Sequence, residues 1–367
     1  MSNKGTGTQS RLTKISDSLT ISKTASVLPW DPNSTVFPSR KDVIRREDAP
    51  EGADWVWGKD DYIGRLNLLT PSRVTAAAKE IKSGEIVPLN LPLDVPKVPG
   101  FGREVFEHTI KPLSDQGVAY DDLYKLNTQS GTQWDGFRHL AHIPSKTFYN
   151  GTKAVDIDGP EANPHKCGIH HWAEHGIAGR GILIDYWGYA QKHGIVYDPF
   201  KHHEISLAEL KACADTQGID IRPASQGGDI AIGDLLFIRT GFVSAYHTRT
   251  PSVRTAAALR PHTIGKDDQQ RWAGVKQDDA MIDWLHDCYF SAVAGDAPAF
   301  EAWPSQKDYM LHEYILAMWG MPLGEMFDLE NLAKTCLEKG RWMFFVTSSP
   351  DHVNGGVSSH GNALAVF

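Results

Sequence analysis

Hydrophobic positions with helical spacing alternate with short apolar runs from residue 70 onwards. Thr70 followed by Pro71 is typical of a helix N-terminus, apolar residues then recur at helical spacing up to Ile81, and Gly84 is expected to end this helix. An extended segment with prolines, typical of an edge strand, follows from Ile86 to Leu93. The same reasoning predicts strands over residues 181–186, 233–241, 289–295, 342–347 and 363–367, and helices over residues 206–218, 279–286, 312–319 and 328–339. Strands alternate with helices but several strands follow one another directly, which predicts a layered α/β or α+β domain.

The first 57 residues have a different character. Residues 1–27 are rich in Ser, Thr, Lys and Gly without periodicity, which is typical of a disordered or loosely draped tail. From residue 28, several prolines and tryptophans predict an extended arm pinned by aromatic side chains. We therefore expect residues 1–57 to form a tail and arm, and residues 58–367 to form a single domain.

Composition excludes several classes of function. The net charge is -8 with acidic and basic residues well mixed, so no basic block is available to follow a phosphate backbone. No apolar run is long enough to cross a bilayer, and the N-terminus lacks the apolar core of a secretory signal. The four cysteines are far apart and form no CxxC pair, which favours buried thiols in a reducing compartment. We expect a cytoplasmic protein that acts on a small molecule, and its strand edges and many aromatic residues favour a homo-oligomer.

The segment 128–139 contains the densest group of chemically capable side chains. It reads Thr-Gln-Ser-Gly-Thr-Gln-Trp-Asp-Gly-Phe-Arg-His. A turn with Gly131 at positive φ would bring Gln129, Gln133 and Asp135 to one point, where His139 could act as a base. Taken alone, Asp135 is as well explained by a turn cap and His139 by a buried imidazole bonded to a carbonyl.

This segment resembles the signature of the cyclase family, which includes bacterial kynurenine formamidases and isatin hydrolases and reads His-x-Gly-Thr-His-x-Asp-x-Pro-x-His. Gly131, Thr132, Asp135 and His139 match it, whereas Gln129 and Gln133 replace two metal-binding histidines and Phe137 replaces the proline. The resemblance implies a swivelling β/β/α-type mixed sheet with flanking helices. It also implies a divalent metal ion (Mn or Zn) at positions 129, 133 and 135, with His139 as the acid/base. Amides are weak ligands, so the alternative is that no metal binds.

A second segment resembles the downstream part of the same family. His312 lies on a predicted helix, and Glu325 follows after Gly320 and Pro322 break that helix. The resemblance implies that His312 and Glu325 line the active site, with Glu325 supporting the catalytic histidine or a metal. The competing interpretation of Glu325 is a surface residue near a helix N-terminus.

The sequence context also suggests roles for several other residues. Gln129, Gln133, Trp134, Phe137 and Arg138 are candidates for binding substrate, the amides through hydrogen bonds and the rings as walls. Arg239 and Asp296 at strand ends are expected to be structural, and Gly355 is expected to form a turn. His165, His170 and His171 are expected to be solvated imidazoles in a loop.

Three functions are consistent with the sequence. The first is a small-molecule hydrolase of arylformamidase-like type, acting on a C–N (amide or formamide) or lactone bond, in which His139 takes a proton from water, Glu325 orients His139, and a metal assists. The second is a metal-independent acid/base cyclase, dehydratase or isomerase in the same pocket. The third is a non-catalytic member of the family. Metal analysis separates the first two, and turnover separates both from the third.

Overall fold

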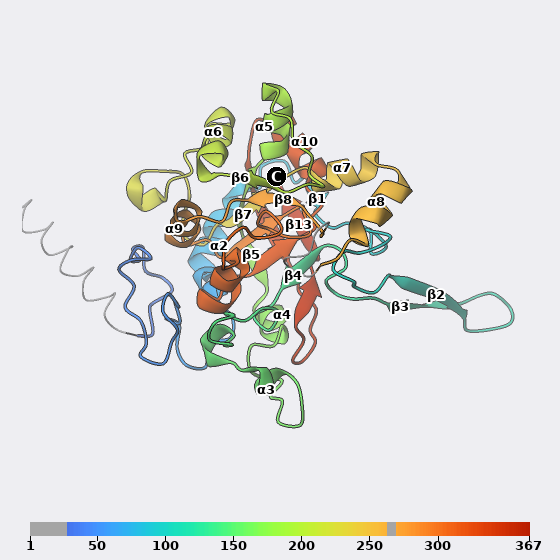
Figure 1. Ribbon diagram of the computed structural model, residues 1–367, viewed down its shortest axis with the longest axis horizontal. Coiled ribbons are helices and arrows are strands. Elements are labelled where there is room, and N and C mark those ends of the chain that lie inside the picture. The colour runs from blue at the N-terminus through green and yellow to red at the C-terminus, as the bar shows by residue number, and fades with distance from the viewer. Residues whose placement is uncertain (1–27, 263–268) are drawn as a thin grey trace, which may run out of the picture.

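A large mixed sheet with helices around it forms the centre of the molecule (Figure 1). The computed structural model describes residues 28–262 and 269–367. Within these residues the main sheet has nine strands, and its central neighbours β5, β7, β9 and β10 run parallel while the outer pairs run antiparallel. In spatial order the strands are β1 (Ile86–Pro88), β13 (Ala363–Val366), β11 (Met343–Ser348), β5 (Ile177–Ile184), β7 (Leu235–Ile238), β9 (Ala292–Gly295), β10 (Leu323–Glu325), β4 (Gln133–Asp135) and β12 (Ser358–His360).

Helices and two small sheets complete the fold. The small sheets pair β2 (Glu107–Pro112) with β3 (Tyr120–Lys125), and β6 (His203–Ile205) with β8 (Ala273–Val275). The α-helices are α2 (Pro71–Ala77), α3 (Ala154–Ile157), α4 (His170–His175), α5 (Tyr186–His193), α6 (Leu207–Gln217), α7 (Phe242–Thr248), α8 (Pro251–Ala258), α9 (Asp279–Asp287) and α10 (Glu330–Lys339). Short 3₁₀ segments lie at Gly64–Leu68, Ala78–Glu80, Tyr149–Gly151 and Ala224–Gln226, and Glu313–Met318 forms a π-helix. Among the described residues, no helix has the length and apolar character that a membrane span needs.

Apolar side chains explain why the parallel strands lie at the centre. All four residues of β7 and of β9 are buried, as expected for strands covered on both faces. On the antiparallel strand β11, buried positions alternate with partly exposed ones, as expected for a strand near the edge of a layer. The fold is therefore the mixed α/β sheet with flanking helices that the sequence predicted.

The arm from residue 28 packs onto the domain through aromatic rings. Trp30 is buried beside Tyr289, and the indole N–H of Trp55 donates to the carbonyl of Ala317. These contacts attach the arm to the domain, whereas the tail predicted for residues 1–27 lies outside the described residues.

Most predicted elements are present, with differences at their ends. The Ser206–Glu209 capping box forms at the start of α6, and Gly218 ends that helix in the left-handed conformation. The first predicted helix ends as a 3₁₀ turn at Glu80, before Gly84, and the strand expected to reach Leu93 stops at Pro88. Helix α5 was not predicted, because its apolar residues lack strong helical periodicity; it is capped by the carboxylate of Asp185.

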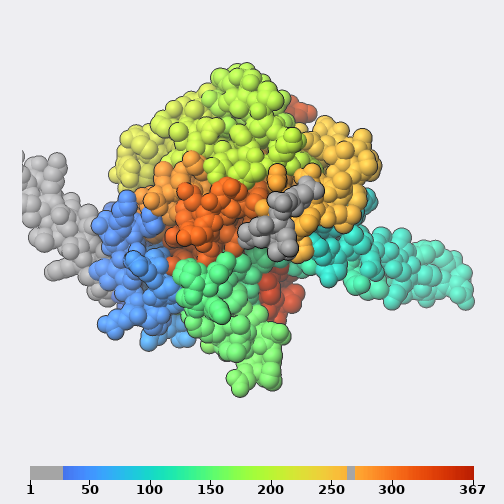
Figure 2. All heavy atoms as spheres, in the orientation of Figure 1, coloured from blue at the N-terminus to red at the C-terminus, as the bar shows by residue number. Residues whose placement is uncertain are grey.

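A hairpin of β2 and β3 projects from the body of the molecule (Figures 1 and 2). Every residue of both strands is exposed, including Ile110, Tyr120 and Tyr124. The sequence analysis did not predict this hairpin, because its alternation of polar and apolar residues is interrupted by charged pairs.

Candidate active site

Pairing of β4 with β10 brings the two chemically rich segments together. In this antiparallel register Gln133 lies opposite Glu325, and Asp135 lies opposite Leu323. Gln133 and Asp135 are two residues apart on a strand, so their side chains point to the same face. Gln129 reaches the same point from the turn before β4 and donates to Asp135, so the three side chains converge as predicted. The cause differs in part, because Gly131 does not have a positive φ and strand alternation aligns Gln133 with Asp135.

The two glutamines direct their amide nitrogens at carboxylates. Gln129 Nε2 donates to Asp135 Oδ1 over 2.8 Å, and Gln133 Nε2 donates to Glu325 Oε2 over 2.8 Å. An amide nitrogen cannot coordinate a cation, so in this arrangement neither glutamine acts as the metal ligand that the resemblance implied. Each glutamine instead fixes one oxygen of a buried carboxylate; the other oxygen of Glu325 is bonded to His312, whereas the other oxygen of Asp135 has no partner among the described residues.

Asp135 Oδ2 is the free oxygen at the centre of the site. Among the described residues, this buried oxygen has no hydrogen-bond partner. The Nε2 atoms of His139 and His312 lie 3.9 and 3.8 Å from it, too far for hydrogen bonds. The three groups therefore surround a space in which a small polar atom would contact all of them.

His139 is neutral and has one preferred tautomer. Gln129 Nε2 lies 2.7 Å from His139 Nδ1 and can only donate, so Nδ1 accepts and the proton resides on Nε2. Burial lowers the pKa of His139, although the Asp135 carboxylate opposes this effect. His139 thus presents an N–H donor toward Asp135. Glu325, which was expected to orient His139, hydrogen-bonds to Gln133 and His312 instead.

His312 lies between two buried carboxylates. Its Nδ1 is 2.7 Å from Glu301 Oε2, and its Nε2 is 3.0 Å from Glu325 Oε1. Burial disfavours the imidazolium, but the two carboxylates outweigh burial and raise the pKa of His312 well above its usual value. The residue directly precedes the π-helix Glu313–Met318, a local irregularity that is frequent at functional sites.

Asp135 has a raised pKa, mainly because burial penalises its charge and also because Glu325 is nearby. His139 and His312 partly offset this effect. A carboxylate with a raised pKa is a better proton acceptor than an ordinary aspartate.

A cavity of about 250 Å³ opens onto this group. Its wall includes His139, His312 and Glu325, and also Arg103, whose guanidinium donates to the carbonyl of Gln129. Apolar side chains supply most of the remaining wall, including Phe101 and Trp303. The cavity can therefore hold a small, partly apolar molecule next to two histidines and an arginine.

Sequence analysis missed Arg103 and Glu301. Arg103 lies in a glycine-rich stretch with no motif, so the sequence carried no signal for it. Glu301 is fully buried and is the one charged residue in the apolar run from Ala297 to Trp303, a signal that could have identified it.

Three predicted substrate-binding residues have structural contacts instead. Trp134 packs against Phe327 and donates to Ser348, and Phe137 packs against Tyr149 and Trp172. Arg138 donates to the carbonyls of Asn163, Lys166 and Gly355. None of the three belongs to the wall of the 250 Å³ cavity. Alternation along β4 places Trp134 on the face opposite Gln133 and Asp135, which explains its position.

Asp135, His312 and Glu325 form a group that fits a divalent cation. Each offers one ligand atom, and these atoms lie within 4.8 Å of one another. One imidazole and two carboxylates suit Mn²⁺, Fe²⁺ or Zn²⁺, and the partnerless Asp135 Oδ2 supports the fit. A cation and a proton would compete for His312 Nε2, because binding either one uses the same lone pair.

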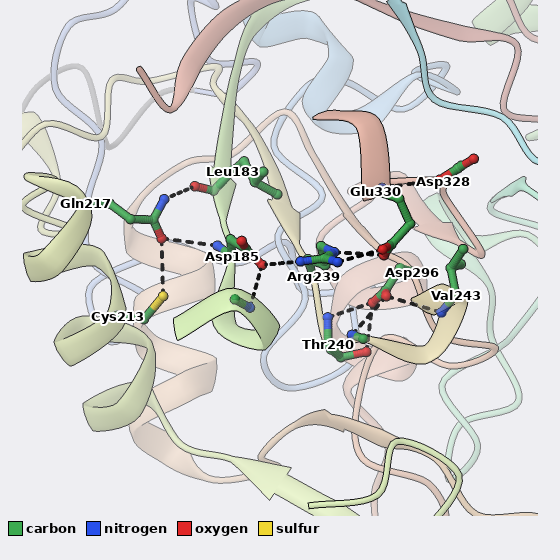
Figure 3. A network of polar contacts seen from close by, with 12 residues as sticks. Leu183, Asp185, Cys213, Gln217, Arg239, Thr240, Val243, Asp296, Asp328 and Glu330 are labelled. Atoms are coloured by element: carbon green, nitrogen blue, oxygen red, sulfur yellow. Dashed lines mark hydrogen bonds and ion pairs between the residues drawn. The ribbon is translucent and has the colours of Figure 1, made fainter. Parts of the chain in front are cut away.

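Arg239 and Asp296 are structural, as predicted. Arg239 forms ion pairs with Asp185 and Glu330, which joins the end of β7 to the starts of α5 and α10 (Figure 3). Asp296 accepts hydrogen bonds from Thr240 and from the backbone N–H of Gly241. This network holds the strand ends beside the site without reaching the cavity.

Comparison with known proteins identifies the family. A family model described as putative cyclase matches residues 87–302, well over half of the chain. The chain belongs to the cyclase family. The matched region includes Asp135 and His139 but ends before His312 and Glu325, which the β4–β10 pairing brings into the site.

Solved structures share the fold. A structure described as a novel cyclase is 27% identical, with a TM-score of 0.71, over 86% of this chain and 99% of that one. Isatin hydrolase A from Ralstonia solanacearum is 15% identical, with a TM-score of 0.51, over 81% of this chain and 98% of that one. No curated protein matches the sequence.

Proposed function

We propose that this cyclase-family protein is a hydrolase that opens a C–N (amide or formamide) or lactone bond of a small, partly apolar molecule. The observation that carries the proposal is the buried, partnerless Asp135 Oδ2, which faces two imidazoles of the cavity wall at nearly equal distances. Family membership supports the proposal, as does the shared fold with a protein described as isatin hydrolase A.

The chain's own groups divide the chemistry among them. Asp135 Oδ2 accepts a proton from water as the water attacks the carbonyl carbon, and the same proton then passes to the leaving nitrogen or oxygen. The Nε2–H of His139 donates to the developing oxyanion, and the imidazolium of His312, whose two N–H groups donate to Glu301 and Glu325, stabilises the developing negative charge by its own positive charge. This assignment makes His139 a hydrogen-bond donor and Asp135 the base, the reverse of the roles expected from the sequence.

The group Asp135, His312 and Glu325 would hold a divalent ion where a metal is used. Such an ion would polarise the carbonyl as a Lewis acid. The second candidate is a metal-independent acid/base cyclase, dehydratase or isomerase that uses the same pocket, and the observation that favours it is that both glutamines donate to the acids.

A substrate panel tests the proposal. Purified protein is expected to open N-formylated aromatic amines, cyclic amides or aromatic lactones, with the product acid measured by chromatography. Hydrolysis that survives exhaustive chelation, with metal content near zero, would favour acid/base chemistry without a metal. Loss on chelation with recovery on adding Mn²⁺ or Zn²⁺ would favour the metal-assisted one. Absence of turnover across the panel would count against the hydrolase.

The pH profile follows from the pKa directions. The mechanism requires an ionised Asp135 and a neutral His139, so activity is lost as pH falls through their pKa values. The pKa of Asp135 is raised from its usual 3.8, and the pKa of His139 is lowered from its usual 6.5. His312 must be protonated, and its pKa lies well above 6.5, so kcat/KM is expected to be level around neutral pH. Glu301→Gln removes one carboxylate from His312 and should move the alkaline limb to lower pH. An unmoved alkaline limb in this variant would contradict the assignment of His312.

We also propose that the β2–β3 hairpin packs against a second copy of the chain. Its opposed residues place Ile110, Tyr120 and Tyr124 on one face, together with the His108–Asp122 pair. Thr109, Leu123 and the Glu107–Lys125 ion pair lie on the other face. A two-stranded hairpin with an uncovered apolar face is marginally stable alone in water. The hairpin also connects Arg103 to Gln129, so its packing would affect the rim of the cavity.

Charge on the apolar face is expected to separate the copies. Ile110→Lys with Tyr120→Lys should reduce the mass measured by analytical ultracentrifugation from that of an oligomer to that of a monomer. Thr109→Lys, on the opposite face, is the matched control and should leave the mass unchanged. A wild-type protein that sediments as a monomer would refute the proposal.

A cytoplasmic location is proposed on the cysteines. All four are free and buried, as expected in a reducing compartment.

A further inference from the structure

A second group of imidazoles gathers at the start of α4, away from the cavity. His165 comes from the preceding loop, and His170 and His171 begin the helix. Each of the three offers a nitrogen within 4.8 Å of the nitrogens of the other two. The ring centroids of His170 and His171 are 4.1 Å apart, and those of His165 and His171 are 4.7 Å apart. This arrangement differs from the solvated loop that the sequence predicted.

Hydrogen bonds leave ring nitrogens of this group available. His171 Nε2 lies 2.6 Å from the carbonyl oxygen of His165, which can only accept, so Nε2 carries the proton and Nδ1 has the free lone pair. A histidine ligand that donates its other N–H to a backbone carbonyl is the usual arrangement at metal sites. Among the described residues, neither ring nitrogen of His165 has a hydrogen-bond partner.

His170 is the buried member of this group. Its side chain accepts a hydrogen bond from the backbone N–H of Gly355 over 3.2 Å, and the residue is 6% exposed. The acceptor is Nδ1, so this nitrogen carries a lone pair.

Glu174 supplies a carboxylate beside the imidazoles. Its Oε2 is 3.7 Å from His171 Nδ1, and its Oε1 is 3.6 Å from His352 Nε2. The ring of His352 lies parallel to that of His170, with the centroids 6.4 Å apart. One carboxylate among four imidazoles cannot compensate their charges if all are protonated, so proton binding alone does not explain why they gather.

We propose that His165, His170 and His171 bind a divalent late transition metal such as Zn²⁺, with Glu174 completing the coordination. Imidazole ligands suit Zn²⁺, Ni²⁺ and Cu²⁺ rather than Mg²⁺ or Ca²⁺. The site is independent of the proposed hydrolase centre and of the reaction there.

The proposed role is to cross-link the loop that carries His165 to the start of α4, beside the segment that carries His139. Arg138, which directly precedes His139, already ties the loop of Asn163 and Lys166 to Gly355. The metal would join the same loop to α4. Metal binding at either nitrogen of His170 would break the hydrogen bond that its Nδ1 accepts from the backbone N–H of Gly355. If Nδ1 binds the metal, its lone pair is used. If Nε2 binds the metal, the proton of Nε2 moves to Nδ1, which can then no longer accept.

Cobalt titration of tag-free protein tests the site. The variant Asp135→Asn with Glu325→Gln removes the other candidate metal group and serves as the parent. The parent is expected to bind one Co²⁺ or Zn²⁺ per chain, with visible Co²⁺ absorption bands of an imidazole-rich site. Adding His165→Ala and His171→Ala should weaken this binding by more than about 100-fold. Loss of a residue that only hydrogen-bonds to a ligand lowers metal affinity by up to about 100-fold, and loss of the ligands themselves should cost more. His175→Ala, on the same helix, is the matched control and should bind as the parent does.

Thermal unfolding separates metal binding from folding. Zn²⁺ should raise the Tm of the parent and of the His175→Ala control but not of the variant lacking His165 and His171, while the metal-free Tm values stay close. If the double variant does not fold, His165→Ala alone, at an exposed loop position, gives the same comparison. Unchanged Co²⁺ affinity in these variants, or a parent that binds no metal, would overturn the proposal.

Discussion

Replacing His139 with alanine is expected to lower kcat of the proposed hydrolase by about 100- to 1000-fold, the usual effect of removing one donor to an oxyanion. The reason is the tautomer: Gln129 donates to Nδ1, so Nε2–H faces the space beside Asp135. KM should change little, because the donor acts mainly in the transition state. Steady-state kinetics on the best substrate of the panel measures both constants.

Two further variants sharpen this result. His139→Gln keeps an N–H donor and is expected to retain more activity than His139→Ala; equal loss in both would indicate that the imidazole acts as a base. His142→Ala is the matched control, because His142 is close in sequence but hydrogen-bonds to Ser145 outside the site. The control should keep wild-type kcat, and a comparable loss there would contradict the assignment of His139.

Replacing Arg239 with methionine is expected to lower the free energy of unfolding by about 3 kcal/mol, because two carboxylates lose their shared partner. The side chains of Arg239 and Asp185 are each 11% exposed and that of Glu330 is 27% exposed, so the Asp185 charge is left in a poorly solvated place. Figure 3 shows the guanidinium between the two acids. Urea unfolding followed by tryptophan fluorescence measures the change.

The matched control tests the geometry of this network. Arg239→Lys keeps the charge but cannot reach Asp185 and pair in a bidentate way with Glu330, so about half of the loss should remain. Arg222→Met, at an exposed pair with Asp220, should change stability by less than about 1 kcal/mol. A small effect of Arg239→Met would mean that water replaces the guanidinium.

Local patterns predicted the elements whose signals are short-range. The capping box of α6 and the strands β5, β7, β9 and β11 depend on a few neighbouring residues, so periodicity and caps located them. The family signature placed Asp135 and His139 at the site. Helix α5 was missed because its apolar residues lack strong helical periodicity, and the β2–β3 hairpin was missed because cross-strand pairs hold it together.

The sequence by itself determined the mixed α/β class, the family, and the residues Gln129, Gln133, Asp135, His139, His312 and Glu325, because side-chain chemistry and strand periodicity are local properties. Only the tertiary structure decided how these residues are arranged. Pairing of β4 with β10 aims the amide of Gln133 at Glu325, and the turn before β4 aims that of Gln129 at Asp135, which excludes the glutamines as ligands in this arrangement. The buried carboxylates of Glu301 and Glu325 raise the pKa of His312. Those effects depend on contacts between residues far apart in the chain and on burial, neither of which a linear pattern contains.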